Sequence, residues 1–239
     1  MQDQGKRTAM NASPVEDDSS NLVEAARYAL LRRLAPALCH RMVGAVHPIE
    51  LLAEAIERRL QSAVPDLASA RENIGKIKNL SGSAVLACTH LTSWLVPDEG
   101  AVTMLGEGID ESLALLDTDF AMRGFTIRNE AREIGVDVSC AALRNVLTAS
   151  LIAATDTAPQ PADLVLTAEL SQGHAVLSIQ VRPADRVAGF ADAAAYRRLE
   201  WSDVGALAQA ESVELLRQGD RVTLRYPVAG APHRGPLPR

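Results

Sequence analysis

The sequence predicts an α+β protein in which a long N-terminal helical hairpin precedes a mixed sheet with helices on one face. Apolar residues recur every three or four positions over residues 21–97, whereas helix and strand signals alternate beyond residue 97. The charge changes at the same place. Residues 1–97 carry 11 basic and 10 acidic side chains, and residues 98–239 carry 13 and 20. Two domains with a boundary near Pro97 are therefore predicted.

The first long segment, residues 21–61, predicts one amphipathic helix, because its apolar residues form a single stripe. The stripe consists of Leu31, Leu34, Leu38, Met42, Ala45, Ile49, Leu52, Ile56 and Leu60. Pro36 and Pro48 are expected to bend this helix without ending it. The polar residues 1–20, which have no periodicity, are predicted to be disordered.

A second stripe follows the break SAVPD and predicts a helix that packs antiparallel to the first. Its members are Leu67, Ala70, Ile74, Ile77, Leu80, Ala84, Ala87, Leu91 and Trp94. One hairpin has too little surface to bury both stripes, so we expect two chains to form a homodimeric four-helix bundle. Residues 21–97 are thus predicted to be a dimerisation hairpin.

The remaining chain predicts helices and strands that form one layered domain over residues 98–229. The expected elements are a helix at 102–119, a strand at 125–130, a helix beginning at Ser139 and ending near 156, a hairpin of strands at 162–170 and 174–181, a helix at 201–210, and a hairpin over 213–228 with its turn at 218–220. The Pro- and Gly-rich residues 230–239 are predicted to be a flexible tail.

Composition excludes several classes of function. The chain is 47% hydrophobic and 23% charged, as in soluble globular proteins. Its net charge of −6 opposes binding to nucleic acid. Since no stretch reaches the ~18 apolar residues of a membrane span and no signal peptide is recognisable, a cytoplasmic protein without membrane contact is predicted. Cys39, Cys88 and Cys140 are far apart and have no histidine at metal-ligand spacing, so neither a disulfide framework nor a metal site is expected.

Four segments, together with the order of elements, resemble the core of sensor histidine kinases of bacterial two-component systems. They are LRRLAPALCHRMVGAVHPIELLAEAI, GEGIDESLALLDTDFAMRGFTIRNE, VSCAALRNVLTASLIAATD and RVTLRYPV. The first resembles the helix that carries the phospho-accepting histidine, and the third resembles the asparagine-box helix of the ATPase-like domain. The resemblance extends over about residues 21–229.

The ATP-binding motifs of that family are degenerate in this chain. The resemblance places Ala153 where the family has its Mg²⁺-binding asparagine, with Ala149 one turn earlier, and an alanine offers no oxygen to a hard cation. The Asp-x-Gly-x-Gly box is replaced by VRPADRVAGF, and only Gly205 remains of the glycine-rich lid. We therefore expect no ATP, metal or other cofactor.

This combination resembles the dimeric kinase-like histidine phosphotransferases of bacterial phosphorelays more closely. Leu38, Cys39 and His40 are similar to the family's phosphorylation motif, which implies that His40 is the phosphoacceptor. The family carries an acidic residue directly after the histidine and a proline five residues after it. This chain has Arg41 and Ala45 at those positions.

Other side chains near His40 are candidates for binding a partner. Arg33 and Arg41 could steer an acidic receiver domain or neutralise a phosphoryl group, or they could simply solvate the outer face of the bundle. His47 lies about two turns after His40 on the same face, and could be an alternative acceptor or part of a docking patch. His90 is expected to be a paired, partly buried histidine.

Three functions are compatible with these residues. In the first, His40 accepts a phosphoryl group from a response-regulator receiver domain and passes it to another receiver without ATP. In the second, the protein is a non-catalytic pseudokinase scaffold that binds a signalling partner, which Arg41 and Ala45 favour. In the third, it is an ATP-dependent kinase whose motifs are aligned incorrectly. The sequence favours the first.

Overall fold

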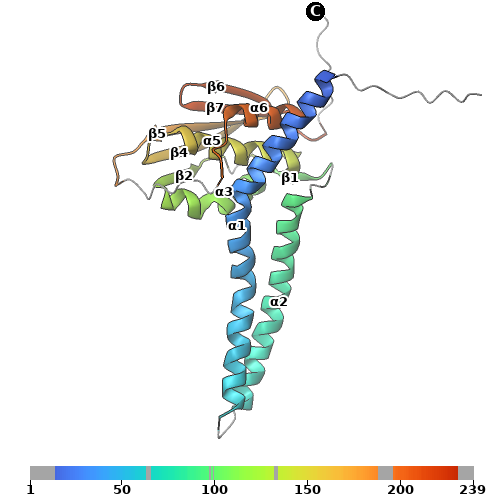
Figure 1. Ribbon diagram of the computed structural model, residues 1–239, viewed down its shortest axis with the longest axis vertical. Coiled ribbons are helices and arrows are strands. Elements are labelled where there is room, and N and C mark those ends of the chain that lie inside the picture. The colour runs from blue at the N-terminus through green and yellow to red at the C-terminus, as the bar shows by residue number, and fades with distance from the viewer. Residues whose placement is uncertain are drawn as a thin grey trace, which may run out of the picture.

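A computed structural model of the protein describes residues 14–62, 66–96, 98, 100–131, 134–187 and 196–230. Two long helices form a hairpin, and a sheet covered by shorter helices lies at the open end of that hairpin (Figure 1). The α+β class and the order of hairpin and mixed sheet are therefore confirmed.

Helix α1 spans Pro14–Leu60 and continues through Pro36 and Pro48, as predicted. Residues 14–20, which we predicted to be disordered, are helical and form its first turns. Residues 1–13, and the tail from residue 231 onward, lie outside the described residues. Helix α2 spans Leu67–Leu95 and is capped by the preceding residue, Asp66, whose carboxylate accepts a hydrogen bond of 3.0 Å from the backbone N–H of Ser69.

The two helices pack side by side along a seam of small and medium side chains. On α2 this seam contains the buried residues Ala70, Asn73, Ala84, Leu91 and Trp94, which recur every three or four positions. Another apolar face of the hairpin stays uncovered. Its members Met42, Val46, Ile74 and Val85 are 42 to 63% exposed.

The chain then enters a small two-stranded sheet that the sequence did not predict. Strand β1 (Val102–Met104) pairs antiparallel with β3 (Asp137–Ser139), and helix α3 (Leu105–Met122) starts only after β1. The prediction of a helix from Val102 was therefore wrong for its first three residues. A three-residue strand is too short for its period to stand out from the helical pattern that follows.

The main sheet has the strand order β2-β4-β5-β7-β6. Strand β2 (Phe125–Asn129) is parallel to β4 (Ala162–Ser171), and a helical crossover joins them. Strands β5 (His174–Pro183), β7 (Arg221–Pro227) and β6 (Glu214–Gln218) extend the sheet in antiparallel fashion. Both predicted hairpins, β4–β5 and β6–β7, are confirmed.

The helices of this part cover one face of the sheet. The crossover consists of α4 (Cys140–Ala142), a π-helical turn η1 (Leu143–Leu147) and α5 (Thr148–Thr157), and α6 (Trp201–Ala210) follows later. Alternate strand residues are fully buried beneath them, among them Leu164, Leu166, Leu177, Ile179 and Leu224.

The upper half of α1 belongs to this same core. Ala26, Ala29, Leu30 and Leu34 are at most 2% exposed and pack with the buried residues of the helices over the sheet. Helix α1 contacts α6 and α3 here before it descends to pair with α2 (Figure 1). The stretch 21–97, predicted to be a hairpin domain by itself, therefore contributes its first helix to both parts of the molecule.

Candidate functional site

His40 lies on α1 just below the helices that cover the sheet. Its side chain is exposed, and it makes no hydrogen bond or ion pair with any residue that the structure describes. An imidazole in this position can be approached from solvent. The exposure that we predicted for His40 is confirmed.

A large cavity opens beside His40. Its volume is about 1200 Å³, and it lies between α1, the C-terminal half of α3, the end of α5 and the segment around Tyr196. His40 and Arg41 lie at its α1 side, together with Arg32 and Arg33. The upper part of α1 and the sheet with its covering helices, which we call the second domain, thus form a concave site next to the predicted phosphoacceptor.

A buried ion cluster forms the end of this cavity. Arg33 donates two hydrogen bonds to the carboxylate of Asp156, of 2.5 and 2.9 Å, and Arg123 donates a third of 3.0 Å. The backbone N–H of Leu199 donates a fourth of 3.2 Å. The side chains of Arg33, Arg123 and Asp156 are only 3 to 9% exposed. This cluster ties α1 to α5 and α3.

The pKa of Asp156 reflects two opposing effects. Burial raises the pKa of a carboxyl group, but the hydrogen bonds and charge of Arg33, with the charge of Arg123 and the Leu199 amide, favour the ionised form. The second set of effects is stronger, so the pKa of Asp156 lies below its ordinary value. The carboxylate is therefore charged at neutral pH.

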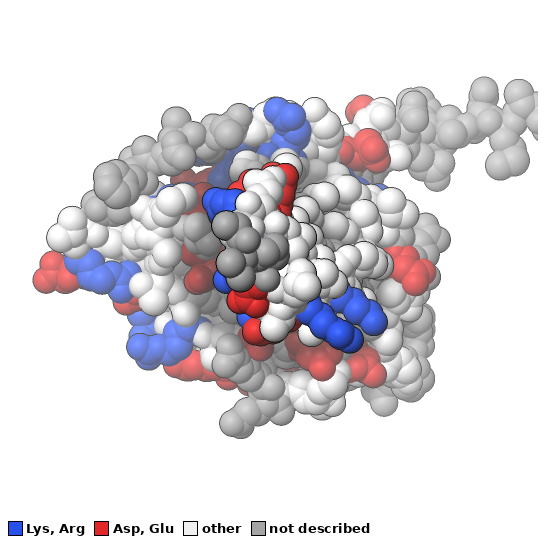
Figure 2. All heavy atoms as spheres, turned by 90° about the horizontal axis from the view of Figure 1, so that it is seen from below, with Lys and Arg blue, Asp and Glu red and all other residues white. Residues whose placement is uncertain are grey.

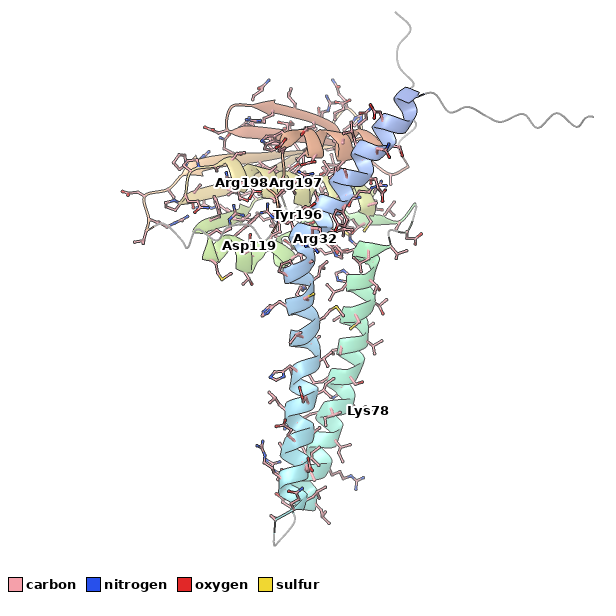
Figure 3. All side chains as sticks on the ribbon, viewed as in Figure 1. Arg32, Lys78, Asp119, Tyr196, Arg197 and Arg198 are labelled. Atoms are coloured by element: carbon pink, nitrogen blue, oxygen red, sulfur yellow. The ribbon has the colours of Figure 1, made fainter. Side chains whose placement is uncertain are left out.

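Arg32, Tyr196 and Arg198 also line the cavity. The guanidinium of Arg32 lies 5.4 Å from the ring centroid of Tyr196, within cation–π distance. Arg197 is held by Asp203 through hydrogen bonds of 2.6 and 2.8 Å, and Arg198 follows it. Figure 3 shows Arg32, Tyr196, Arg197 and Arg198 together where α1 meets the second domain.

The predicted partner-binding residues have three different environments. Arg33 is engaged by Asp156 inside the cluster and holds α1 in place, so its charge is not available to a docking protein. Arg41 is exposed and has no ion-pair partner among the described residues. His47 is exposed, and its Nδ1 lies 3.4 Å from Glu50 Oε2. Sequence reasoning did not find Asp156 or Arg123.

His90 of α2 lies beside a second cavity, where it contacts α3. Its Nε2 lies 3.2 Å from Glu111 Oε1, which also accepts a hydrogen bond of 2.9 Å from Arg144. A smaller cavity of about 500 Å³ adjoins these residues and also includes Arg41 and Cys140. His90 is thus paired, as expected, and its side chain is 46% exposed. Burial raises the pKa of the Cys140 thiol.

The helix that resembles an asparagine box offers no oxygen ligands at the expected positions. Ala149 and Ala153 on α5 are both completely buried. The asparagine present on this segment, Asn145, donates a hydrogen bond of 2.9 Å to Glu211, which also pairs with Arg27 of α1. Within the described ranges, no group of three or more His, Cys, Asp or Glu side chains is arranged to hold a metal ion.

The surface around the hairpin carries mixed charge. Figure 2 looks at the molecule from below, toward the hairpin tip, and Lys and Arg side chains are interspersed there with Asp and Glu.

None of the helices in the described part of the chain combines the length and apolar character needed to cross a membrane.

Comparisons with known proteins gave matches only among solved structures. No family model and no curated protein matches the sequence. The chain is similar to the Acinetobacter baumannii histidine kinase AdeS, with 15% identity, a TM-score of 0.41, and coverage of 77% of this chain and 98% of that one. It is also similar to a bacterial phosphotransferase, with 12% identity, a TM-score of 0.37, and coverage of 91% and 98%.

A third similar structure is the mycobacterial sensor histidine kinase MprB, with 13% identity and a TM-score of 0.38. That match covers 54% of this chain and 98% of the other.

Proposed function

We propose that the protein is a histidine phosphotransferase of a bacterial phosphorelay, with His40 as the phosphoacceptor. The observation that carries this proposal is the position of His40: an exposed, unpartnered imidazole on a helical hairpin, in a segment that resembles the phosphorylation motif of that family. A phosphorylated receiver domain of a response regulator supplies the phosphoryl group, and a second receiver takes it.

The chemistry needs only an accessible neutral imidazole. The lone pair of a ring nitrogen attacks phosphorus, the bond between phosphorus and the aspartyl oxygen breaks, and the receiver's aspartate leaves as a carboxylate. In the second step, the aspartate carboxylate of the next receiver attacks phosphorus, and the N–P bond to His40 breaks. Because an acyl phosphate is already activated, neither step consumes ATP. In-line attack requires the open approach that His40 has.

Two features support a role without ATP. The positions that would supply Mg²⁺ ligands are Ala149 and Ala153, which have no oxygen and are completely buried. The upper half of α1 also packs against α6 and carries Arg27, which pairs with Glu211 at the end of α6. Because these contacts join α1 to the second domain, the second domain would act as a docking and positioning surface instead of an ATP-binding one.

The uncovered apolar face of the hairpin supports a homodimer. On α2, Leu67, Ile74 and Val85 are separated by seven and eleven residues, about two and three turns, so they lie on one face. Each is more than half exposed in the single chain. Two hairpins that bury these faces together would form the four-helix bundle. The receivers would then dock on the outer side, near Arg41 and His47.

Transfer of radiolabel from a phosphorylated receiver tests this proposal. We expect acid-labile label to appear on the wild-type protein and on His47→Gln but not on His40→Gln. Incubation with labelled ATP alone should give none. Label on His40→Gln would assign the acceptor elsewhere, and label from ATP alone would point to a kinase.

The alternative function is a scaffold that binds a signalling partner without phosphoryl transfer. Arg41 favours it, since an arginine stands where the similar phosphotransferases carry an acidic residue next to the histidine. The two functions differ in cells. A relay protein loses its signalling output with His40→Gln, whereas a scaffold keeps it.

A further inference from the structure

We propose that the cavity between α1 and the second domain binds an organic anion of about nucleotide size, with a phosphate or carboxylate group attached to an apolar body. This small-molecule site is distinct from the surface on which receiver domains would dock. Binding itself does not depend on the phosphotransfer function. Only its effect on His40, described below, rests on that function.

The size and walls of the cavity fit an organic ligand rather than a bare inorganic ion. Its volume of about 1200 Å³ is somewhat larger than that of ordinary ligand pockets, roughly 300–1,000 Å³, so an organic molecule has ample room. Apolar side chains from three elements line it: Ala37 of α1, Ala114 and Leu115 of α3, and Ile152 of α5, followed by Pro159. Such walls favour an apolar body, because a polar one would lose its hydrogen bonds to water without gaining partners from the walls.

The charges of the cavity select an anion. Five arginines line it, against two carboxylates. Both carboxylates are engaged: Asp156 by Arg33 and Arg123, and Asp119 by Arg123 at 3.3 Å. The remaining arginines, Arg32, Arg41 and Arg198, have no carboxylate partner among the described residues.

The unpaired arginines line the cavity from more than one part of the chain: Arg32 and Arg41 belong to α1, and Arg198 lies just before α6. Arg32 lies over the ring of Tyr196, and Arg198 follows Tyr196 by two residues; Figure 3 labels all three. A guanidinium suits phosphate and carboxylate oxygens because its donors match their geometry. The ring of Tyr196 holds Arg32 at the cavity through this cation–π contact and is itself packed edge-on against Tyr28.

A ligand here would connect the two parts of the molecule. It would touch α1 on one side and α3 and α5 on the other, next to the ion cluster that already joins them. It would also lie beside His40, which lines the same cavity. If His40 is the phosphoacceptor, a bound ligand would restrict the approach of a receiver and so lower the rate of transfer.

Titration with 8-anilinonaphthalene-1-sulfonate, an organic anion whose fluorescence rises in apolar sites, tests the proposal. We expect Arg198→Ala to weaken binding about tenfold, the usual effect of losing one charge-assisted hydrogen bond. Ala114→Trp, at an exposed wall position, should block the cavity. Lys78→Ala is the matched control, because it removes an exposed cation on α2 far from the cavity (Figure 3). Circular dichroism verifies that each variant is folded.

Competition distinguishes the two sources of the anionic group. Displacement of the dye by AMP would identify a phosphate ligand, and displacement by decanoate a carboxylate ligand. Equal dye binding by the wild type, Arg198→Ala and Ala114→Trp would overturn the proposal. Because dye binding does not require a phosphoryl group, this result and a failure of label transfer to His40 can be told apart.

Discussion

Replacement of Asp156 by alanine should destabilise the protein strongly. Its carboxylate accepts four hydrogen bonds, three of them from the guanidinium groups of Arg33 and Arg123, and all three side chains are at least nine-tenths buried. Alanine would leave two buried cations close together without an anion. Breaking a buried ion pair by removing one partner costs about 3–5 kcal/mol. We expect Asp156→Ala to lower the free energy of unfolding by that amount.

Urea denaturation followed by circular dichroism measures the effect. Asp119→Ala is the matched control. Asp119 also pairs with Arg123, but it is 49% exposed and its contact is 3.3 Å, so its loss should cost less than about 1 kcal/mol. If Asp156→Ala and Asp119→Ala lower stability equally, the cluster is not the connection between α1 and the second domain that the contacts imply.

Three further predictions concern pH, helix packing and assembly. Since the pKa of Asp156 is lower in the folded protein than the ~3.9 of an unfolded chain, its contribution to stability is present above pH ~4 and is lost as the pH falls through the folded pKa. Below about pH 4, the free energy of unfolding of the wild type should therefore fall more steeply with pH than that of Asp156→Ala. Gly108→Ala should lower the free energy of unfolding by about 1–3 kcal/mol, because a Cβ at this position collides with Leu143 Cδ2. Gly205→Ala, in open space on α6, should instead raise it by up to about 1 kcal/mol. Thermal melts measure both changes, and equal shifts of the two melting temperatures would contradict this prediction. In analytical ultracentrifugation, the wild type should sediment as a dimer and Val85→Glu as a monomer. Val187→Glu is the control, because Val187 is exposed and lies outside the hairpin, and it should remain a dimer. A dimeric Val85→Glu would show that this face of the hairpin is not the dimer interface.

Most of the secondary structure could be predicted because it repeats over many residues. The stripes of α1 and α2 and the two hairpins β4–β5 and β6–β7 each extend over enough positions for their periods to be unambiguous. Strands β1 and β3 have three residues each, which is too few. Helical periodicity also shows which face of α1 is apolar but not what covers it. The contact of its upper half with α3 and α6 therefore could not be foreseen.

The candidate site was predictable only in part, for a similar reason. His40 stands out in a local motif, and its exposure follows from its place relative to the apolar stripe. The cluster around Asp156 joins Arg33 to a residue 123 positions away, and no local pattern signals such a pair. Arg33 was therefore expected on the outer surface, whereas the fold turns it inward. The cavity also depends on this long-range packing.

The central claim is that His40 carries a phosphoryl group received from a receiver domain. Mass-spectrometric mapping under alkaline conditions, after the protein is mixed with a phosphorylated receiver, tests it most directly. We predict phosphohistidine at His40 and unmodified His47 and His90, with the signal lost when a second, unphosphorylated receiver is added. An unmodified His40 after exposure to each phosphorylated receiver of the same cell would contradict the relay and favour the scaffold.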